Sequence, residues 1–149
     1  MQVLCIVPCS QRKIWDKEPD KGPVPAREAY TGVLTRYAIS YAEKFCDAWV
    51  VLSAKHGLLL PEERVPGPYD ATFKRRRGAN IIPIDELRRQ AAEKGLYSYD
   101  KVVVLAGKAY AEVARRVFGE RVVWPLRGLG YGEKVRALKK AVGENRPLH

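Results

Sequence analysis

Four short apolar runs have the pattern of strands that are covered on both faces. They are rich in valine and almost continuously hydrophobic, which is typical of strands in a parallel sheet. The runs are Val3–Val7, Ala48–Leu52, Val102–Leu105 and Val122–Trp124. We therefore predict a buried sheet of four parallel strands.

Helical periodicity fills the segments between and after these runs. Apolar residues recur at spacings of three and four, in one stripe of Leu34, Tyr37, Ala38, Tyr41 and Phe45, a second of Tyr110, Val113, Ala114 and Val117, and a third of Tyr131, Val135, Leu138 and Val142. Asp85 is the expected N-cap of a further helix that carries Leu87 and Ala91. The expected helix stops are Gly95, Gly119 and Gly143. Alternating strands and helices predict right-handed crossovers, and hence a three-layer α/β/α sandwich.

The length of 149 residues corresponds to a single domain that spans residues 1–149 and can bury a core of its own. One connection, residues 55–83, has little regular patterning and contains four prolines and three glycines. A loop of this length in a compact domain usually has a function or is disordered. We expect a function, because the segment also holds the densest polar chemistry of the chain.

Positive charge is concentrated in the second half of the chain. The formal net charge is +10. Residues 1–70 hold nine basic and nine acidic side chains, whereas residues 71–149 hold eighteen basic and eight acidic ones. This asymmetry favours an anionic partner, with nucleic acid as the first candidate. A merely soluble basic surface is the alternative that charge alone leaves open.

Several functional classes are disfavoured by composition and motifs. No apolar run reaches the length of a membrane span, and the N-terminus lacks the features of a signal peptide, so we expect a cytoplasmic protein without membrane contact. The cysteines Cys5, Cys9 and Cys46 are odd in number and form no C-x-x-C pair, so we expect reduced thiols and no metal site. Neither a G-x-G-x-x-G nor a P-loop motif is present, and we expect no cofactor. Ten prolines beside few Gln, Asn and Met residues resemble a heat-adapted composition.

Each predicted strand is followed by a cation. In open parallel sheets, ligands bind outside the carboxyl ends of the strands. The cations at these ends are Lys13, Lys55, Lys108 and Arg127. Ser10 adds a hydroxyl group, and Gly128 and Gly130 precede a helix start that suits an anion. If these groups converge, they would form a phosphate site. The other interpretation is that cations follow the strands by chance, because Lys and Arg are common in this chain.

Three residues are candidates for acid–base or nucleophilic chemistry. Cys9 is either a nucleophile activated by Lys13 or His56, or a small buried hydrophobe. His56 is the one internal histidine, and it either transfers protons or pins the long loop by a hydrogen bond. Asp70 either orients water or caps its own turn after Pro68.

Two tyrosines and a basic run complete the candidate site. Tyr69, and Tyr30 from the helical turn that Ala26–Ala29 predict, could stack on a base, although Tyr30 suits the core equally well. The run Lys74, Arg75, Arg76 and Arg77 is either a solvated surface or a contact to a polyanion backbone.

These residues resemble a known group of proteins over nearly the whole chain. The segments PCSQRK, AREAYTG, LSAKHGLLLPEERVPGPYDATF, GKAY and PLRGLGYGE resemble an uncharacterised bacterial and archaeal family. That family is similar to YaaA-type peroxide-stress proteins and to a domain of archaeosine synthase with a P-C-x-x-x-K motif, which Pro8, Cys9 and Lys13 match. The resemblance implies a fold like that of uracil-DNA glycosylase and a role on nucleic acid or nucleobases.

The leading hypothesis is a domain that binds a nucleic acid or a nucleotide and acts on a nucleobase, at the N-glycosidic bond or at an exocyclic position. Lys13, Lys55, Lys108 and Arg127 would hold phosphate or stabilise developing negative charge. Two alternatives stay open, a non-catalytic nucleic-acid-binding module and a small nucleotide hydrolase or transferase. The sequence does not determine the oligomeric state.

Overall fold

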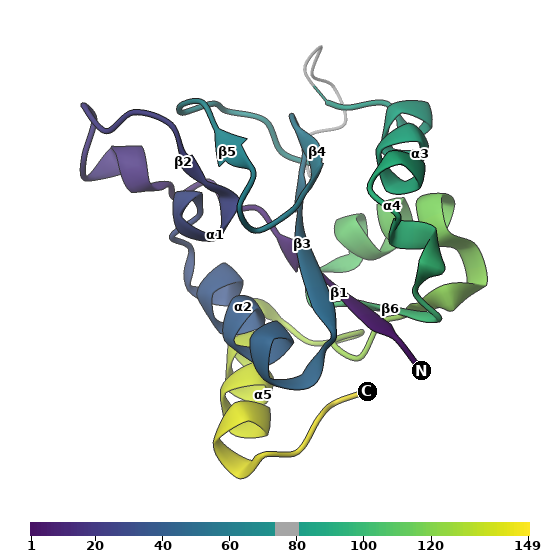
Figure 1. The fold of residues 1–149 in the computed structure, drawn as a ribbon. Coiled ribbons are helices and arrows are strands. Elements are labelled where there is room, and N and C mark those ends of the chain that lie inside the picture. The colour runs from purple at the N-terminus through teal and green to yellow at the C-terminus, as the bar shows by residue number, and fades with distance from the viewer. Residues whose placement is uncertain (74–80) are drawn as a thin grey trace.

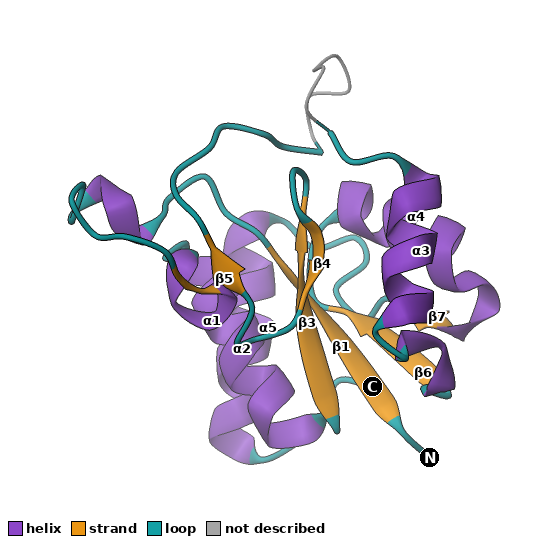
Figure 2. Ribbon diagram, turned by 45° about the horizontal axis from the view of Figure 1, so that its top comes forward, coloured by secondary structure: helices purple, strands orange, loops and turns teal. Residues whose placement is uncertain are grey.

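A five-stranded sheet lies between two layers of helices in the computed structural model (Figures 1 and 2). The structure describes residues 1–73 and 81–149. The order of the strands across the sheet is β4-β3-β1-β6-β7. Their bounds are β1 (Val3–Pro8), β3 (Ala48–Ser53), β4 (Gly57–Leu59), β6 (Lys101–Val104) and β7 (Val122–Val123). The α/β class predicted from the sequence is thereby confirmed.

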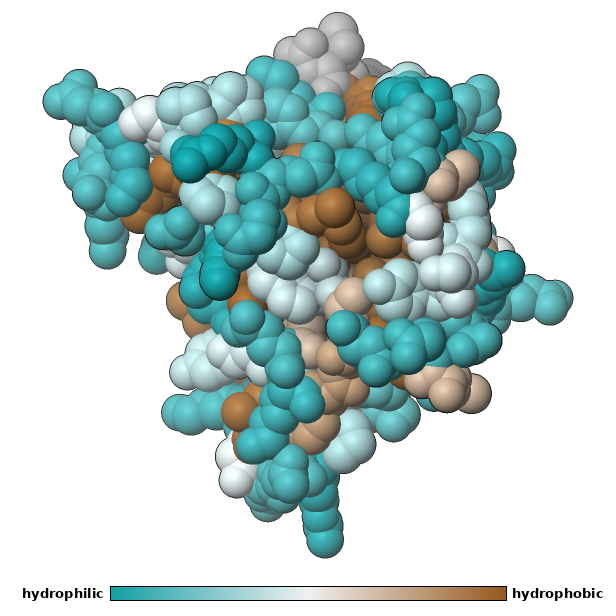
Figure 3. Space-filling view, in the orientation of Figure 1, coloured by the Kyte–Doolittle hydropathy of each residue, from teal (hydrophilic) through white to brown (hydrophobic). Residues whose placement is uncertain are grey.

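The four predicted strands are present and parallel, but the sheet is mixed. β1 pairs in parallel with β3 and β6, and β6 pairs in parallel with β7. The additional strand β4 pairs antiparallel with β3, with Ser53 opposite Gly57. The prediction of a purely parallel sheet missed β4, because its three residues are too few to show a period. Figure 3 shows hydrophobic residues in a hollow at the centre of this face, bordered by hydrophilic residues.

Two helices pack on each face of the sheet. α2 (Val33–Phe45) and α5 (Tyr131–Glu144) lie together on one face, and α3 (Ile84–Glu93) and α4 (Lys108–Phe118) on the other (Figure 2). Short elements join them, namely α1 (Ala26–Ala29), η1 (Ile14–Asp16), η2 (Leu96–Ser98) and η3 (Gly119–Arg121). The stripes of apolar residues therefore identified the long helices correctly.

Two of the predicted helix ends are wrong. Pro83, not Asp85, is the N-cap of α3, and Asp85 lies in the first turn, where a carboxylate favours the positive end of the helix. α5 continues past Gly143 to Glu144, and its C-cap is Asn145, whose φ of 55° is left-handed. Asparagine is one of the residues that tolerate this conformation, so the glycine was not needed as a stop.

The segment 55–83 contains more regular structure than its sequence suggests. Besides β4 it holds β5 (Arg64–Val65), which pairs antiparallel with β2 (Val24–Pro25) in a second, two-stranded sheet. The N–H of Ala26 also donates to the carbonyl of Glu63 at 2.8 Å. These pairings tie the first part of the segment to the region around α1. The basic run at 74–77 lies outside the described residues.

A disulfide joins Cys5 of β1 to Cys46, which follows α2, with a Cα–Cα distance of 6.2 Å. The expectation that all three cysteines are reduced is therefore wrong for this pair, whereas Cys9 is a free, buried thiol. Spacing along the chain could not reveal the pair, because the crossover from β1 through α2 to β3 brings the two residues together.

Within residues 1–73 and 81–149, no helix combines the length and the hydropathy that crossing a membrane requires.

Gly57 is the position at which the β3–β4 turn depends on glycine. Its φ is +82°, and a Cβ atom there would overlap Gln90 Oε1 and lie 2.6 Å from Ile82 Cδ1. Gln90 Oε1 accepts the N–H of Leu58 at 2.8 Å, and Gln90 Nε2 donates to the carbonyl of His56 at 3.0 Å. Gly57→Ala should lower the free energy of unfolding by about 2 kcal/mol in urea denaturation. Gly67→Ala is the control, because nothing lies within 4 Å of its Cβ position, and an unchanged Gly57→Ala midpoint would contradict the turn geometry.

The disulfide predicts the number of reactive thiols. Denatured in guanidinium without reductant, each chain should release one equivalent of a thiol-reactive dye product, from Cys9, and three after reduction. Three equivalents before reduction would show that the pair is not bonded. Cys9→Ser should abolish the signal before reduction and leave two equivalents after it.

Candidate functional site

The candidate site lies at the carboxyl ends of β1 and β6, where the strand order reverses. The chain leaves β1 towards α2 on one face of the sheet, and it leaves β6 into α4 on the other face (Figure 1). Such a switch point opens a crevice, which is where ligands bind in open α/β sheets. A cavity of about 790 Å³ is found here. Its volume is in the range of small-molecule sites.

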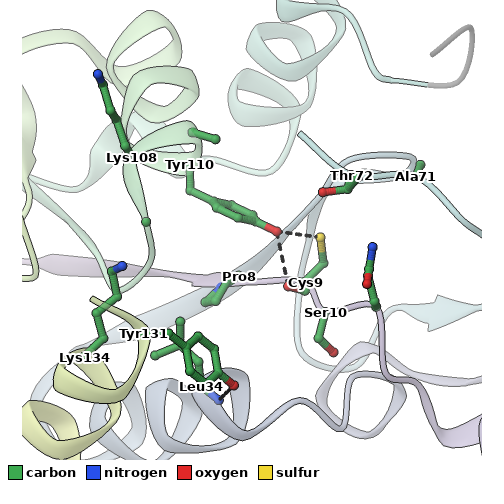
Figure 4. Close-up of a pocket in the computed structure, with 13 residues that line it drawn as sticks. Pro8, Cys9, Ser10, Leu34, Ala71, Thr72, Lys108, Tyr110, Tyr131 and Lys134 are labelled. Carbon is green, nitrogen blue, oxygen red and sulfur yellow. Dashed lines mark hydrogen bonds between the residues drawn. The ribbon is translucent and has the colours of Figure 1, made fainter. Parts of the chain in front are cut away.

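The cavity wall is built from five separate parts of the chain (Figure 4). They are the end of β1, the first turns of α2, α4 and α5, and the segment before Phe73. The lining residues are Pro8, Cys9, Ser10, Gln11, Leu34, Ala71, Thr72, Gly107, Lys108, Ala109, Tyr110, Tyr131 and Lys134. Of the predicted site residues, Cys9, Ser10 and Lys108 are therefore brought together.

Tyr110 fixes the geometry around Cys9. Its hydroxyl group donates to the carbonyl of Cys9 at 3.2 Å and lies 3.1 Å from the Cys9 sulfur (Figure 4). Either group can be the donor in the contact between the hydroxyl and the thiol, and the hydroxyl can donate to the sulfur once the thiol is deprotonated. Phe73 packs edge-on against the Tyr110 ring at 5.4 Å between centroids. Burial raises the pKa of the Cys9 thiol, although Tyr110, the Ala54 backbone and the charge of Lys13 oppose this shift.

The start of α4 is rich in positive charge, with Lys108 Nζ 3.9 Å from Glu112 Oε1 of the next turn. Its N-cap, Gly107, offers no side chain to the free N–H groups, and the first turn contains no acidic residue. Lys108 occupies the first helical position, and Lys134 Nζ lies 3.8 Å from where a Gly107 Cβ would stand. Cations are unfavourable at the positive end of a helix unless an anion lies between them. α5 differs, because the N–H of its N-cap Gly130 donates to Glu133 at 3.0 Å.

Lys13 belongs to a second, buried group of side chains rather than to the cavity wall. Its side chain is almost fully buried, and Nζ donates to the carbonyls of Ser10 at 2.8 Å and Gln11 at 3.3 Å. Nζ also lies 4.5 Å from the centroid of the Tyr69 ring. Burial lowers the pKa of Lys13, whereas the charges of Cys9, Asp16 and Asp70 oppose the shift. The ammonium group thus holds the 9–13 loop and does not face a ligand.

Tyr69 is the centre of this buried group. Its hydroxyl group is hydrogen-bonded to the Tyr30 hydroxyl and, at 2.7 Å, to Ser53 Oγ. Ser53 Oγ accepts the N–H of His56 at 2.9 Å. Burial raises the pKa of Tyr30 to about 12 and that of Tyr69 further still. Tyr30 is fully buried, so its ring is not available to stack on a base.

His56 lies beside Tyr69 and not on the cavity wall. The two rings meet edge-on at 5.0 Å, and His56 Nε2 is buried without a hydrogen-bond partner in the described part of the chain. Burial and the charge of Lys55 lower the pKa of His56, so the imidazole is neutral at neutral pH. Its backbone bonds to Ser53 and Gln90 pin the β3–β4 turn.

The four predicted cations do not form one ring. Lys55 is exposed, with Nζ 5.6 Å from the Tyr69 centroid. Arg127 and Asp70 are exposed and do not line the cavity. Gly128 has a left-handed φ of 81° in the turn before α5. In residues 1–73 and 81–149, no three His, Cys, Asp or Glu side chains gather as metal ligands would.

Of the lining residues, only Cys9, Ser10 and Lys108 were proposed as site residues from the sequence. Among those that were missed, four have long or aromatic side chains on the first turns of helices, namely Leu34, Tyr110, Tyr131 and Lys134. The tyrosines were assigned to apolar stripes, and Lys134 was counted only as charge. Helices that follow parallel strands begin at the carboxyl edge of the sheet. The residues of their first turns, and not only the strand ends, could therefore have been proposed.

Comparison with known proteins places the chain among uncharacterised relatives. A family of unknown function (DUF6884) matches residues 4–140. The "Uncharacterized protein YfjM" of Bacillus subtilis (strain 168) is 45% identical over 153 residues, which cover 99% of this chain and all of that protein. No solved structure matches the chain.

The contacts of Cys9 predict how its thiol reacts. Because burial raises the pKa of Cys9, alkylation by iodoacetamide in the native state should be slow at neutral pH and accelerate only above pH 9, the ordinary value given for a cysteine. Tyr110→Phe removes a hydrogen bond that lowers this pKa, so the midpoint of the pH–rate curve should move upward. Tyr97→Phe, which removes a hydroxyl bonded to the carbonyl of Val117, is the control. A downward shift in Tyr110→Phe would contradict the assigned contact.

Proposed function

The chain belongs to the DUF6884 family of unknown function, and we propose that it binds a nucleotide, free or within a nucleic acid, and acts on the nucleobase. The observation that carries the proposal is the cavity at the β1/β6 switch point. One of its sides is suited to a phosphate group, and the opposite side presents a thiol and a hydroxyl group.

The phosphate group would lie at the start of α4. Free N–H groups, Lys108 and Lys134 meet there. The first turn contains no carboxylate, and Glu112 of the next turn makes a long contact of 3.9 Å with Lys108. An anion at this point relieves the repulsion between two ammonium groups and the helix end. The same arrangement would not attract a neutral ligand, which favours a phosphate-bearing one.

The base would lie towards the end of β1. This side of the cavity combines the apolar side chain of Leu34 with the polar groups of Cys9, Ser10 and Thr72. A few polar groups on an apolar wall are what orient a heterocycle. Because the Cys9 thiol stands on this wall, it is the group best placed to contact the base. The positive charge of Lys13, which lies behind this wall, favours the thiolate form of Cys9 because it lowers the pKa of the thiol.

The proposal includes a resemblance to archaeosine synthase, whose P-C-x-x-x-K motif is matched by Pro8, Cys9 and Lys13. It also includes the likeness to YaaA-type proteins and a cytoplasmic location. The central position of β1 among parallel strands supports a fold like that of uracil-DNA glycosylase. In that arrangement the reaction would take place at the N-glycosidic bond or at an exocyclic atom of the base.

Nucleoside monophosphates test the phosphate end of the cavity. Uridine, cytidine, adenosine and guanosine 5′-monophosphates are titrated into the protein in a calorimeter at low salt. Lys108→Ala and Lys134→Ala should each weaken the tightest of the four by about tenfold, because each removes one charged contact to phosphate. Lys44→Ala removes a charge from the last turn of α2, at its far end from the cavity, and should leave the affinity as it is. Equal affinity in the Lys108, Lys134 and Lys44 variants would refute the assigned phosphate position.

Gly107→Asp separates loss of the site from loss of the fold. The backbone of Gly107 is extended, so aspartate fits there and can cap α4, and the free energy of unfolding should stay within a few tenths of a kcal/mol. Its carboxylate would occupy the position of the phosphate and repel it, so monophosphate binding should be lost. If this variant binds like the wild type, the helix start is not the phosphate site. If binding depends on Lys108 while Cys9→Ala and Ser10→Ala change neither binding nor any product, the domain is a non-catalytic binding module.

A further inference from the structure

We infer that the ligand of this cavity is part of a single-stranded nucleic acid, whose next base stacks on Tyr131 and whose backbone continues along α5. The inference rests on the proposed nucleotide site and names its substrate class. It arises from an exposed ring and from unpaired cations that a mononucleotide would not use.

The aromatic ring of Tyr131 is exposed to solvent at the mouth of the cavity. This tyrosine is the first residue of α5, lines the cavity and is 58% exposed. Its hydroxyl oxygen accepts the N–H of Leu34 in the first turn of α2 at 3.3 Å (Figure 4). The neighbouring Val33 is also exposed, at 45%. An apolar surface fixed in this way, beside a pocket for one nucleotide, is a platform on which an unpaired base can stack.

Cations continue from this platform along the helix. Arg136 reaches back to the start of α5, where its guanidinium lies 3.6 Å from the Cβ position of Gly132. Lys139 and Lys140 are exposed on the next turn. None of the three forms an ion pair within the described part of the chain, unlike Arg88 and Arg89 of α3, which pair with carboxylates. The charges of these three residues are therefore available to the backbone phosphates of a strand that passes the start of α5.

These positions follow one another in the order that a strand requires. The first phosphate lies at Lys108 and Lys134, the adjacent base on Tyr131 and the next phosphate at Arg136. The bases of a duplex are stacked and paired inside the helix, so their faces cannot reach a ring at the mouth of a pocket. Single strands offer both faces of each base without that cost. The geometry therefore favours single strands over duplex.

The experiment compares two probes on the same variants. A labelled 5′-phosphorylated oligothymidylate of about eight nucleotides is measured by fluorescence anisotropy, and thymidine 5′-monophosphate by competition against it. The readout is the affinity for the oligonucleotide divided by the affinity for the mononucleotide. Damage to the phosphate site weakens the binding of both probes and therefore leaves this ratio unchanged. Wild-type protein should bind the oligonucleotide at least about tenfold more tightly than the mononucleotide.

Three variants and one control decide the matter. Tyr131→Ala should reduce the ratio by about tenfold, whereas Tyr131→Phe, which keeps the ring, should retain most of it. Arg136→Ala should lower the slope of log affinity against log salt for the oligonucleotide by about 0.7, as expected for one lost phosphate contact. Tyr99→Ala is the control, because this half-buried ring lies before β6 at the opposite edge of the sheet.

The inference is overturned if Tyr131→Ala keeps the ratio of wild type, if Tyr131→Phe loses as much as Tyr131→Ala, or if a duplex of the same length binds more tightly than the single strand. In each of these cases a mononucleotide that still depends on Lys108 leaves the proposed function standing. If the oligonucleotide depends on Tyr131 but neither probe depends on Lys108, the surface is right and the proposed phosphate position is wrong.

Discussion

The burial of β1 between two parallel neighbours is the constraint on which the rest of the structure depends. All but the first of its residues are buried, and β3 and β6 occupy both of its edges. Parallel neighbours require crossover connections, and two apolar faces require a layer of helices on each side. The helices that follow the strands therefore begin at one edge of the sheet. This convergence places the starts of α2, α4 and α5 around the end of β1. The topology thereby determines which segments line the cavity.

The polar residues near that edge have two separate tasks. Lys13, Tyr30, Ser53, Tyr69 and His56 are hydrogen-bonded, or stacked, mainly with one another and with backbone groups. They tie the loop after β1 to the segment before Phe73, which together form one wall of the cavity. Lys108 and Lys134 are not enclosed in this way: both line the cavity, where Lys108 Nζ lies 3.9 Å from Glu112 Oε1. Lys13 and His56, which were candidates for catalysis in the sequence, thus lie behind the cavity wall, whereas Lys134, which counted only as charge, lines the cavity.

The positive charge of the second half of the chain lies partly beside the cavity. The neutral first half supplies the end of β1 and the buried tyrosine group, whereas the cations of α4 and α5 come from the basic second half. Because α5 packs beside α2, Lys134 lies at the cavity although it is about 125 residues away from Cys9 in sequence. Net charge alone would have allowed any basic surface. The packing of α5 restricts the relevant part to one side of one cavity.

The sequence by itself determined the main strands and long helices, and it indicated the carboxyl edge of the sheet as the place of the candidate site. Continuous apolar runs and helical stripes depend on local periodicity, so β1, β3, β6, α2 and α4 were predictable, and with them the placement of Cys9, Ser10 and Lys108 at strand ends. Only the tertiary structure decided the remainder, because it depends on packing between distant segments. Tyr110 and Tyr131 occupy stripe positions like core residues, yet one fixes Cys9 and the other stays exposed. Lys13 looks like Lys108 in sequence, but two carbonyls and the Tyr69 ring enclose its ammonium group, whereas Lys108 remains open to the cavity.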